Sequence, residues 1–206
     1  MKKLFAVAIL LALSTAIAVQ AMRANCPAPV AADTPAALAI GTTVADFKLP
    51  DADGTEHTLA SLKGAKGTVI IFIATKCPVS NGYNERMQKL AEDYKAKGVN
   101  VVGINSNETE PATEVKEHAA KKGLTFTILK DAGSQIADRF NAQSTPEAYL
   151  LDAAGKLVYH GAIDNSRYGD SITSTFLRDA IDATLAGKAV EKPEVKAFGC
   201  SIKRAS

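Results

Sequence analysis

One apolar run, residues 68–73, constrains the fold of this chain more than any other feature. Its sequence, Thr-Val-Ile-Ile-Phe-Ile, is typical of a strand that is buried on both faces. Residues 79–97 then show helical spacing, with Met87 and Leu90 on one apolar side and Gly98 closing the segment. A buried strand followed by an amphipathic helix predicts a sheet that is covered by helices.

The remaining segments alternate between strand patterns bounded by turn residues and helix patterns. The expected strands are residues 44–50, 56–59, 101–105, 124–129, 147–151 and 156–159. The expected helices are residues 110–122, 134–140 and 174–186. The first two strands and the last two are each close enough to form a hairpin. This order predicts an α/β fold, a three-layer α/β/α sandwich with a mixed central sheet and an added N-terminal β-hairpin.

Residues 1–21 have the plan of a secretory signal peptide. Lys2 and Lys3 precede an uncharged apolar run over residues 4–19, and small residues end the segment at Ala21. The apolar run is shorter than the roughly 20 residues needed to span a bilayer, so we expect cleavage after Ala21 rather than a membrane anchor. The sequence thus predicts export, to the periplasm or outside the cell, followed by an Ala/Pro-rich linker over 22–43 and one domain over 44–206.

Charge and motifs narrow the classes of partner. The formal net charge is +2, and removal of Lys2 and Lys3 with the signal leaves a neutral protein, which disfavours nucleic acid and anionic membranes as partners. The three histidines are scattered without the spacing of metal ligands, and no haem, phosphate-loop or serine-elbow motif is present. We therefore expect no metal or cofactor, and proteins or small molecules as partners.

Cys77 is the residue best placed for chemistry. It stands between the buried strand and the helix, where helix N–H groups and the helix dipole favour thiolate over thiol and so lower the pKa. Pro78 suits the first helical position, and Lys76 adds a positive charge nearby. Ser80 occupies the position that a second cysteine would take in Cys-x-x-Cys. A simple packing role for Cys77 is the alternative.

The other two cysteines leave several pairings open. The mature chain would keep Cys26, Cys77 and Cys200 in a compartment where disulfides persist. Cys200 could resolve a mixed disulfide at Cys77, but only if the C-terminal tail folds back over the start of the helix. It could equally form a static bridge. Arg23 and Asn25 do not fit a lipidation motif, which leaves Cys26 without an assigned role.

Residues 44–204 resemble the redoxin branch of the thioredoxin superfamily, whose members are similar to alkyl hydroperoxide reductase and thiol-specific antioxidant. Within this branch, four segments resemble those of a peroxiredoxin-like group. Similar members carry Cys-Asn-His-Cys-Pro-Tyr-Val, Cys-Thr-Pro, Asp-Asp-Ser-Arg and Gly-Cys-Ser-Ile-Lys. In this chain the segments begin at Ala74, Ser144, Asp164 and Gly199, and read Ala-Thr-Lys-Cys-Pro-Val-Ser, Ser-Thr-Pro, Asp-Asn-Ser-Arg and Gly-Cys-Ser-Ile-Lys.

The resemblance implies further roles and also shows departures. A thioredoxin fold implies a cis bond at Thr145-Pro146 facing the reactive cysteine, with the Thr145 backbone as an edge for an extended substrate. Ala74 and Ser144 replace two cysteines of the group. Ile70 and Ala74 also replace the proline and threonine with which peroxiredoxins orient peroxide.

These features lead to one main hypothesis and two rivals. We expect an exported thiol-disulfide oxidoreductase with Cys77 as nucleophile and Cys200 as resolving thiol, acting on protein thiols or disulfides with a separate redox partner. The first rival is a thiol peroxidase with antioxidant activity, whose substrates are small peroxides. The second is a non-catalytic thioredoxin-fold module in which Cys77 and Cys200 form a permanent bridge.

Overall fold

Strand β3 (Gly67–Phe72) lies at the centre of a six-stranded sheet in the computed structural model, and all of its residues are buried. The model describes residues 38–205, so the predicted signal peptide and Cys26 lie outside the described residues. Strand β3 pairs in parallel with β4 (Val99–Asn105) and antiparallel with β7 (Glu147–Asp152). The sheet is therefore mixed, as predicted.

The outer strands complete the sheet on both sides. The strand order is β5-β4-β3-β7-β8-β9. The outer strands are β5 (Thr127–Lys130), β8 (Leu157–Gly161) and β9 (Glu194–Val195). A separate hairpin is formed by β1 (Lys48–Pro50) and β2 (Glu56–Thr58), and a two-residue pair by β6 (Ser144–Thr145) and β10 (Cys200–Ser201). Strands β7 and β8 pair antiparallel, so the predicted hairpins over 44–59 and 147–159 are both confirmed.

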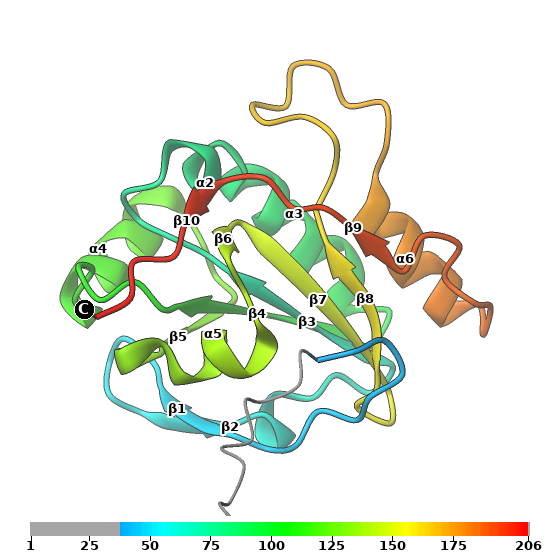
Figure 1. The fold of residues 1–206 in the computed structure, drawn as a ribbon, viewed down its shortest axis with the longest axis horizontal. Helices are drawn as coiled ribbons and strands as arrows, with labels where there is room; N and C mark the ends of the chain where they lie inside the picture. Colours follow the sequence, from blue (N-terminus) through cyan, green and yellow to red (C-terminus); the bar gives the residue numbers. More distant parts are fainter. Residues whose placement is uncertain (1–37, 206) are drawn as a thin grey trace, which may run out of the picture. The chain divides into compact units, whose positions relative to one another are not determined.

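Helices cover both faces of the sheet, and the N-terminal hairpin lies on one of them (Figure 1). One face carries α2 (Pro78–Gly82), α3 (Asn84–Lys95), α4 (Ala112–Lys122) and α6 (Phe176–Leu185). The other carries the hairpin, the short 3-10 helices η1 (Ala60–Leu62) and η2 (Ala132–Ser134), and α5 (Gln135–Phe140). The sheet has a hydrophobic core on each face, and alternate residues of β3 point into each. Val69 and Ile71 pack in the core under α2, α3, α4 and α6, and Ile70 and Phe72 pack in the core under the hairpin. The predicted three-layer sandwich is confirmed.

The helix expected over 79–97 is interrupted at Tyr83, which separates α2 from α3. Gly82, at the break, packs against the backbone of a distant loop, because a Cβ there would lie 3.0 Å from the Arg167 carbonyl oxygen. The carbonyl of Gly82 accepts a hydrogen bond from Arg86. Contacts with a loop more than 80 residues away thus accompany the break, and helical spacing alone does not reveal them.

Both ends of the domain are more ordered than expected. Within the stretch predicted to be a linker, Gly41 donates to the Leu157 carbonyl and Thr43 bridges to Lys156. The C-terminal tail, for which the sequence predicts no strand, contributes β9 and β10. Among the described residues, no helix has the length and apolar character needed to cross a membrane.

Candidate active site

Cys77 is the N-cap residue of α2, directly after the sheet strand β3 and its loop. Pro78 occupies the first turn, as expected, and the backbone N–H of Ser80 points at the Cys77 sulfur at an N–S distance of 3.3 Å. The Cys77 side chain is buried, with 4% of its surface exposed. A helix-start N–H directed at sulfur would donate to a thiolate, so this position suits the charged form of the thiol.

Cys200 forms a disulfide with Cys77 in this structure. The two Cα atoms lie 5.9 Å apart, within the ordinary range for a disulfide, although 123 residues separate them in sequence. Cys200 is partly exposed, whereas Cys77 is buried. The tail therefore folds back over the start of α2, which is the arrangement that pairing required.

The Thr145-Pro146 bond is cis, and it faces the cysteine pair. The Thr145 carbonyl oxygen lies 3.3 Å from the Cys77 sulfur. The backbone edge of Thr145, expected to be presented to a substrate segment, is instead paired with the tail, because Cys200 lies opposite Thr145 and Ser201 opposite Ser144. An extended substrate cannot pair with this edge while β10 occupies it.

A buried carboxylate fixes the loop that leads to Cys77. Glu110 accepts hydrogen bonds from the backbone N–H groups of Thr75 and Lys76, at 2.8 and 3.0 Å, and from the Asn105 amide at 2.6 Å. Burial by itself would raise the pKa of Glu110, but these hydrogen bonds outweigh it and hold the pKa below its ordinary value. Glu110 therefore holds the loop before Cys77 in position as an anion.

The other two predicted neighbours of the thiol also have defined partners. The Lys76 ammonium forms an ion pair with Glu114 at 2.9 Å and donates to the Thr109 carbonyl at 2.8 Å, so a carboxylate balances its charge. The Ser80 side chain is fully buried, and its hydroxyl accepts from the N–H of Ala74 at 3.1 Å. Ser80 thus fixes the loop through its hydroxyl and faces the sulfur through its N–H.

A second buried carboxylate, Glu147, supports the cis-proline loop and is not among the residues predicted from the sequence. It accepts from the N–H groups of Gln143 and Ser144, at 2.8 and 2.9 Å, and pairs with His160 at 2.6 Å. Burial favours a raised pKa for Glu147, but the contacts with His160 and the backbone lower it overall. Its position directly after Pro146, within an apolar strand pattern, was the available signal.

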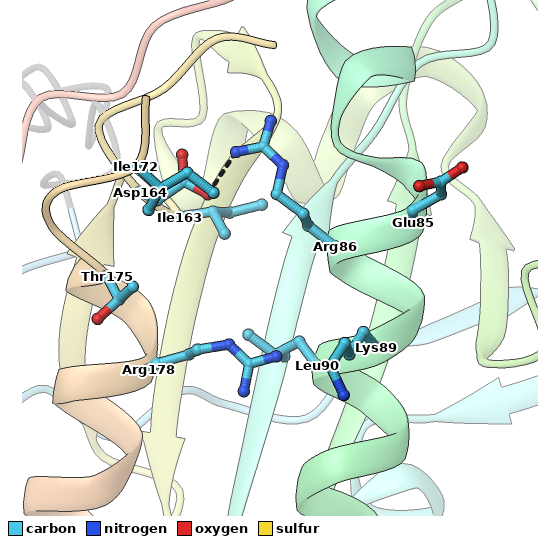
Figure 2. A pocket seen from close by; sticks show the side chains of 9 residues that line it. All are labelled: Glu85, Arg86, Lys89, Leu90, Ile163, Asp164, Ile172, Thr175 and Arg178. Carbon is cyan, nitrogen blue, oxygen red and sulfur yellow. Dashed lines mark hydrogen bonds and ion pairs between the residues drawn. The ribbon is translucent and has the colours of Figure 1, made fainter. Parts of the chain in front are cut away.

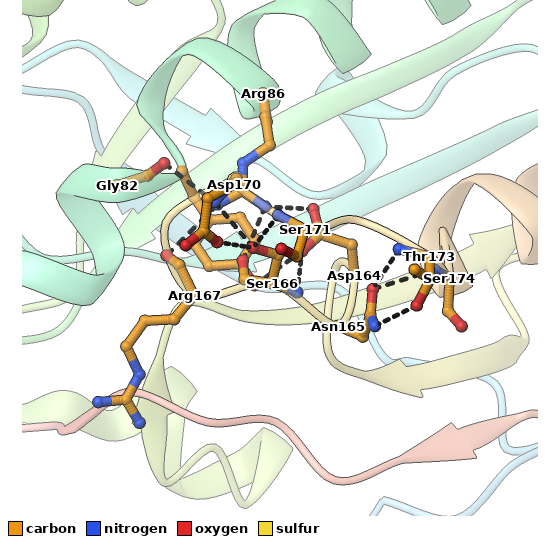
Figure 3. A network of polar contacts seen from close by, with 12 residues as sticks. Gly82, Arg86, Asp164, Asn165, Ser166, Arg167, Asp170, Ser171, Thr173 and Ser174 are labelled. Atoms are coloured by element: carbon orange, nitrogen blue, oxygen red, sulfur yellow. Dashed lines mark hydrogen bonds and ion pairs between the residues drawn. The ribbon is translucent and has the colours of Figure 1, made fainter.

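The segment that begins at Asp164 folds into a polar network beside α2 and α3 (Figure 3). Arg86 from α3 pairs with the Asp164 carboxylate and donates to the Ser166 carbonyl at 2.9 Å. The Tyr83 hydroxyl donates to the other Asp164 oxygen at 3.0 Å. The Arg167 side chain points away from this network, and its guanidinium carbon lies 5.9 Å from the Phe198 ring centre. Arg167 therefore lies beside the tail.

Two cavities have different relations to the disulfide. A cavity of about 290 Å³ is lined by Cys77, Cys200 and polar residues around them. Another, of about 240 Å³, lies between α3 and α6, where Figure 2 shows Arg86 directed at Asp164. The second cavity's arginines are both ion-paired, Arg86 with Asp164 and Arg178 with Asp93, and neither cysteine lines it. The first cavity is therefore the one relevant to thiol chemistry.

A mixed sheet flanked by helices, a cysteine at a strand–helix junction and a facing cis-proline define a thioredoxin-like fold. The AhpC/TSA family model matches residues 40–160, so this chain belongs to the AhpC/TSA family. The thiol-disulfide oxidoreductase ResA of Geobacillus kaustophilus is 34% identical over 121 residues, covering 59% of this chain and 68% of that protein. The predicted family resemblance is confirmed.

Solved structures with this fold are similar to a larger share of the chain. A hypothetical protein from Sinorhizobium meliloti 1021 is 38% identical with a TM-score of 0.77, covering 82% of this chain and 97% of that one. An uncharacterized conserved protein from Geobacillus kaustophilus is 34% identical with a TM-score of 0.76, over 82% of this chain and 93% of its own. Each of these two similarities covers 82% of this chain, which is more than the family model covers with residues 40–160.

Proposed function

We propose that this protein is an exported thiol-disulfide oxidoreductase in which Cys77 supplies the attacking thiolate and Cys200 the second thiol. The observation that carries the proposal is the Cys77–Cys200 disulfide at the N-cap of α2, beside the cis Thr145-Pro146 loop. Membership of the AhpC/TSA family and similarity to proteins named thiol-disulfide oxidoreductase support it.

The proposed cycle uses the local geometry of the pair. In the reduced protein, the Ser80 N–H stabilises the Cys77 thiolate, which attacks one sulfur of a substrate disulfide and releases the other as a thiolate. The Cys200 thiol, held across β6 in register with Thr145, then attacks the Cys77 sulfur of the mixed disulfide. The products are a second substrate thiol and the Cys77–Cys200 disulfide, and a separate reductant must restore the pair.

Trapping of the mixed disulfide tests this cycle. In a Cys26→Ser background, which removes the third thiol, the Cys200→Ser variant should accumulate a covalent adduct at Cys77 after addition of a disulfide, and the Cys77→Ser variant should not. Mass spectrometry of the intact protein and its peptides reads the adduct. Absence of an adduct at Cys77 in the Cys200→Ser variant would overturn the assignment of Cys77 as nucleophile.

Export and the domain division form a separate part of the proposal, supported by the sequence of residues 1–21. We infer a signal peptide over 1–21, a linker that starts at Met22, and a redox domain that includes the tail. The N-terminal residue of the protein recovered from its native compartment tests this. Met22 as the first residue supports cleavage after Ala21, and recovery of an uncleaved chain from the cytoplasm contradicts export.

A further inference from the structure

The substrate edge of the fold is occupied by the protein's own tail. Strand β10 pairs antiparallel with β6, with Cys200 opposite Thr145 and Ser201 opposite Ser144, as Figure 1 shows beside α2. The approach is close, since a Cβ on Gly199 would lie 2.0 Å from the Thr145 carbonyl oxygen. The backbone positions that an extended polypeptide would need for strand addition are therefore taken.

Contacts beyond Cys200 anchor the tail independently of the disulfide. Ile202 is buried in the core on the hairpin side of the sheet, and its N–H donates to the Gln143 carbonyl at 3.0 Å. The Lys203 backbone exchanges hydrogen bonds with residues 107 and 108, at 2.7 and 2.8 Å. Arg204 donates to the Ala142 carbonyl at 2.7 Å and pairs with Asp138.

The segment before Cys200 is anchored as well. Strand β9 pairs with β8 through Glu194 opposite His160 and Val195 opposite Gly161. Gly161 permits this pairing, because a Cβ there would lie 1.7 Å from the Val195 carbonyl oxygen. None of these contacts on either side of Cys200 involves a sulfur atom, so reduction of the disulfide removes none of them directly.

Access to the sulfurs is then through the cavity that both cysteines line. Its volume of about 290 Å³ is just below the range of roughly 300–1,000 Å³ that is typical of small-molecule sites. Its charged lining residues are Lys76, Glu110 and Lys203. Lys76 pairs with Glu114, and Glu110 accepts hydrogen bonds from two backbone N–H groups and from Asn105. Lys203 forms no ion pair with a carboxylate of residues 38–205, and within that range its ammonium donates one hydrogen bond, to the Ser201 hydroxyl at 3.4 Å.

We propose, on the basis of the thiol-disulfide exchange activity proposed above, that the substrate is a low-molecular-weight disulfide bearing carboxylate groups, which enters this cavity beside Lys203. Polypeptide disulfides are excluded because β10 covers the β6 edge. The Cys77 thiolate attacks the small disulfide RSSR, forming Cys77–SSR and releasing RS⁻. The Cys200 thiol then displaces the second RS⁻ and passes its proton to it. Two protein thiols become one disulfide, and RSSR becomes two thiols.

The test compares three small disulfides that differ in charge, with each rate divided by the rate of the same disulfide with free dithiothreitol, because their leaving thiols differ in pKa. The reduced protein, in a Cys26→Ser background, is mixed at low salt with dithiodipropionate, hydroxyethyl disulfide or cystamine, which are anionic, neutral and cationic. Loss of the two thiols is followed by alkylation and mass spectrometry. Because one charge pair a few ångströms apart at a protein surface changes a rate severalfold or more, we expect the anionic probe to exceed the cationic one by at least about tenfold.

Two lysine variants show whether the rate order depends on the charge in the cavity or on the charge of the whole protein. Lys203→Ala should abolish the preference for the anionic over the cationic probe, because it removes the ammonium group. The backbone hydrogen bonds of residue 203, which anchor the tail, remain. Lys66→Ala removes an exposed lysine at the opposite end of β3 and should retain the order. Equal rates for all three probes in the unaltered protein, or an unchanged order in Lys203→Ala, would overturn the assignment of an anionic substrate.

A tail-release variant tests the exclusion of polypeptides. Combining Ile202→Ser with Arg204→Ala removes two anchors and keeps Cys200. The unaltered protein should react with insulin disulfides at least about tenfold more slowly than with dithiodipropionate, and the double variant should narrow this gap. Fast reaction of the unaltered protein with insulin contradicts the proposal but leaves the exchange activity intact. Failure with every disulfide contradicts the exchange activity itself.

Discussion

Cys200 lies directly opposite Thr145 in the antiparallel β10–β6 pair, so one residue's backbone faces both cysteines. The Thr145 carbonyl oxygen lies 3.3 Å from the Cys77 sulfur. The tail cysteine is thus held at the position where a substrate cysteine would approach the thiol of a thioredoxin-like protein. This geometry lets Cys200 act within the chain as the partner of Cys77, without a Cys-x-x-Cys motif.

The disulfide closes a long loop, and its loss should be costly. In the chain-entropy model, a link across 123 residues stabilises the folded state by about 5 kcal/mol. We expect Cys200→Ser to lower the free energy of unfolding by about this amount relative to the oxidised protein, measured by urea denaturation. The reduced unaltered protein is the control and should match the variant. Equal stability of the oxidised and reduced proteins would contradict this prediction.

Gly199→Ala should displace the tail, because its Cβ would meet the Thr145 carbonyl. We expect the variant to lose at least about 1 kcal/mol of stability and to be reduced by dithiothreitol several times faster than the unaltered protein. Gly187→Ala is the matched control. Gly187 has a left-handed φ of 67° with open space around it, so its substitution strains the backbone away from the tail. An unchanged reduction rate in Gly199→Ala would argue against the close packing.

The Arg86–Asp164 pair should be important for stability. Both side chains are largely buried, and Arg86 also lies over the Tyr83 ring at 3.6 Å. Breaking a buried pair leaves an uncompensated charge, so Asp164→Asn should cost about 3 kcal/mol and raise hydrogen exchange in residues 164–174. Lys89→Ala, which breaks an exposed pair on the same helix, should cost less than about 1 kcal/mol. Similar costs for both would contradict this account.

Stability should fall in mild acid because of the two buried glutamates. The pKa values of Glu110 and Glu147 are lowered in the folded protein, so the unfolded chain binds more protons as the pH drops. Their contribution is fully present above the ordinary pKa of about 4.3 and is lost as the pH falls through the lower folded values. Urea denaturation between about pH 3 and pH 7 measures this slope.

Glutamine variants assign that slope to the two sites. Glu110→Gln and Glu147→Gln should each reduce the dependence of the unfolding free energy on pH below about 5. Glu117→Gln, which alters an exposed residue of α4, is the control and should leave the slope as it is. If the unfolding free energy of both glutamine variants depended on pH as it does in the unaltered protein, groups other than Glu110 and Glu147 would be responsible for the loss of stability in acid.

Local patterns predicted the framework of the site. The apolar run at 68–73 and the proline after Cys77 each act over a few residues, which is why β3 and the N-cap position of Cys77 could be inferred. The interruption at Tyr83 and the roles of Glu110 and Arg86 could not. They depend on contacts with segments distant in the sequence, 34 residues or more away, that periodicity does not encode.

The C-terminal tail shows most clearly that periodicity does not encode contacts between segments distant in sequence. The residues around Cys200 have neither helical nor strand periodicity, and β10 exists because the Thr145 edge offers hydrogen bonds to it. The sequence therefore left the partner of Cys77 open. It also led to the expectation of an accessible substrate edge, which the structure corrects.

The reduction potential of the Cys77–Cys200 pair tests the central claim most directly. The protein, in a Cys26→Ser background, is equilibrated in graded thiol–disulfide buffers, and the oxidised fraction is read by alkylation and mass spectrometry. A pair that cycles in exchange should have a potential between about −270 and −120 mV. A value below about −300 mV would identify a permanent structural bridge and contradict the proposed activity.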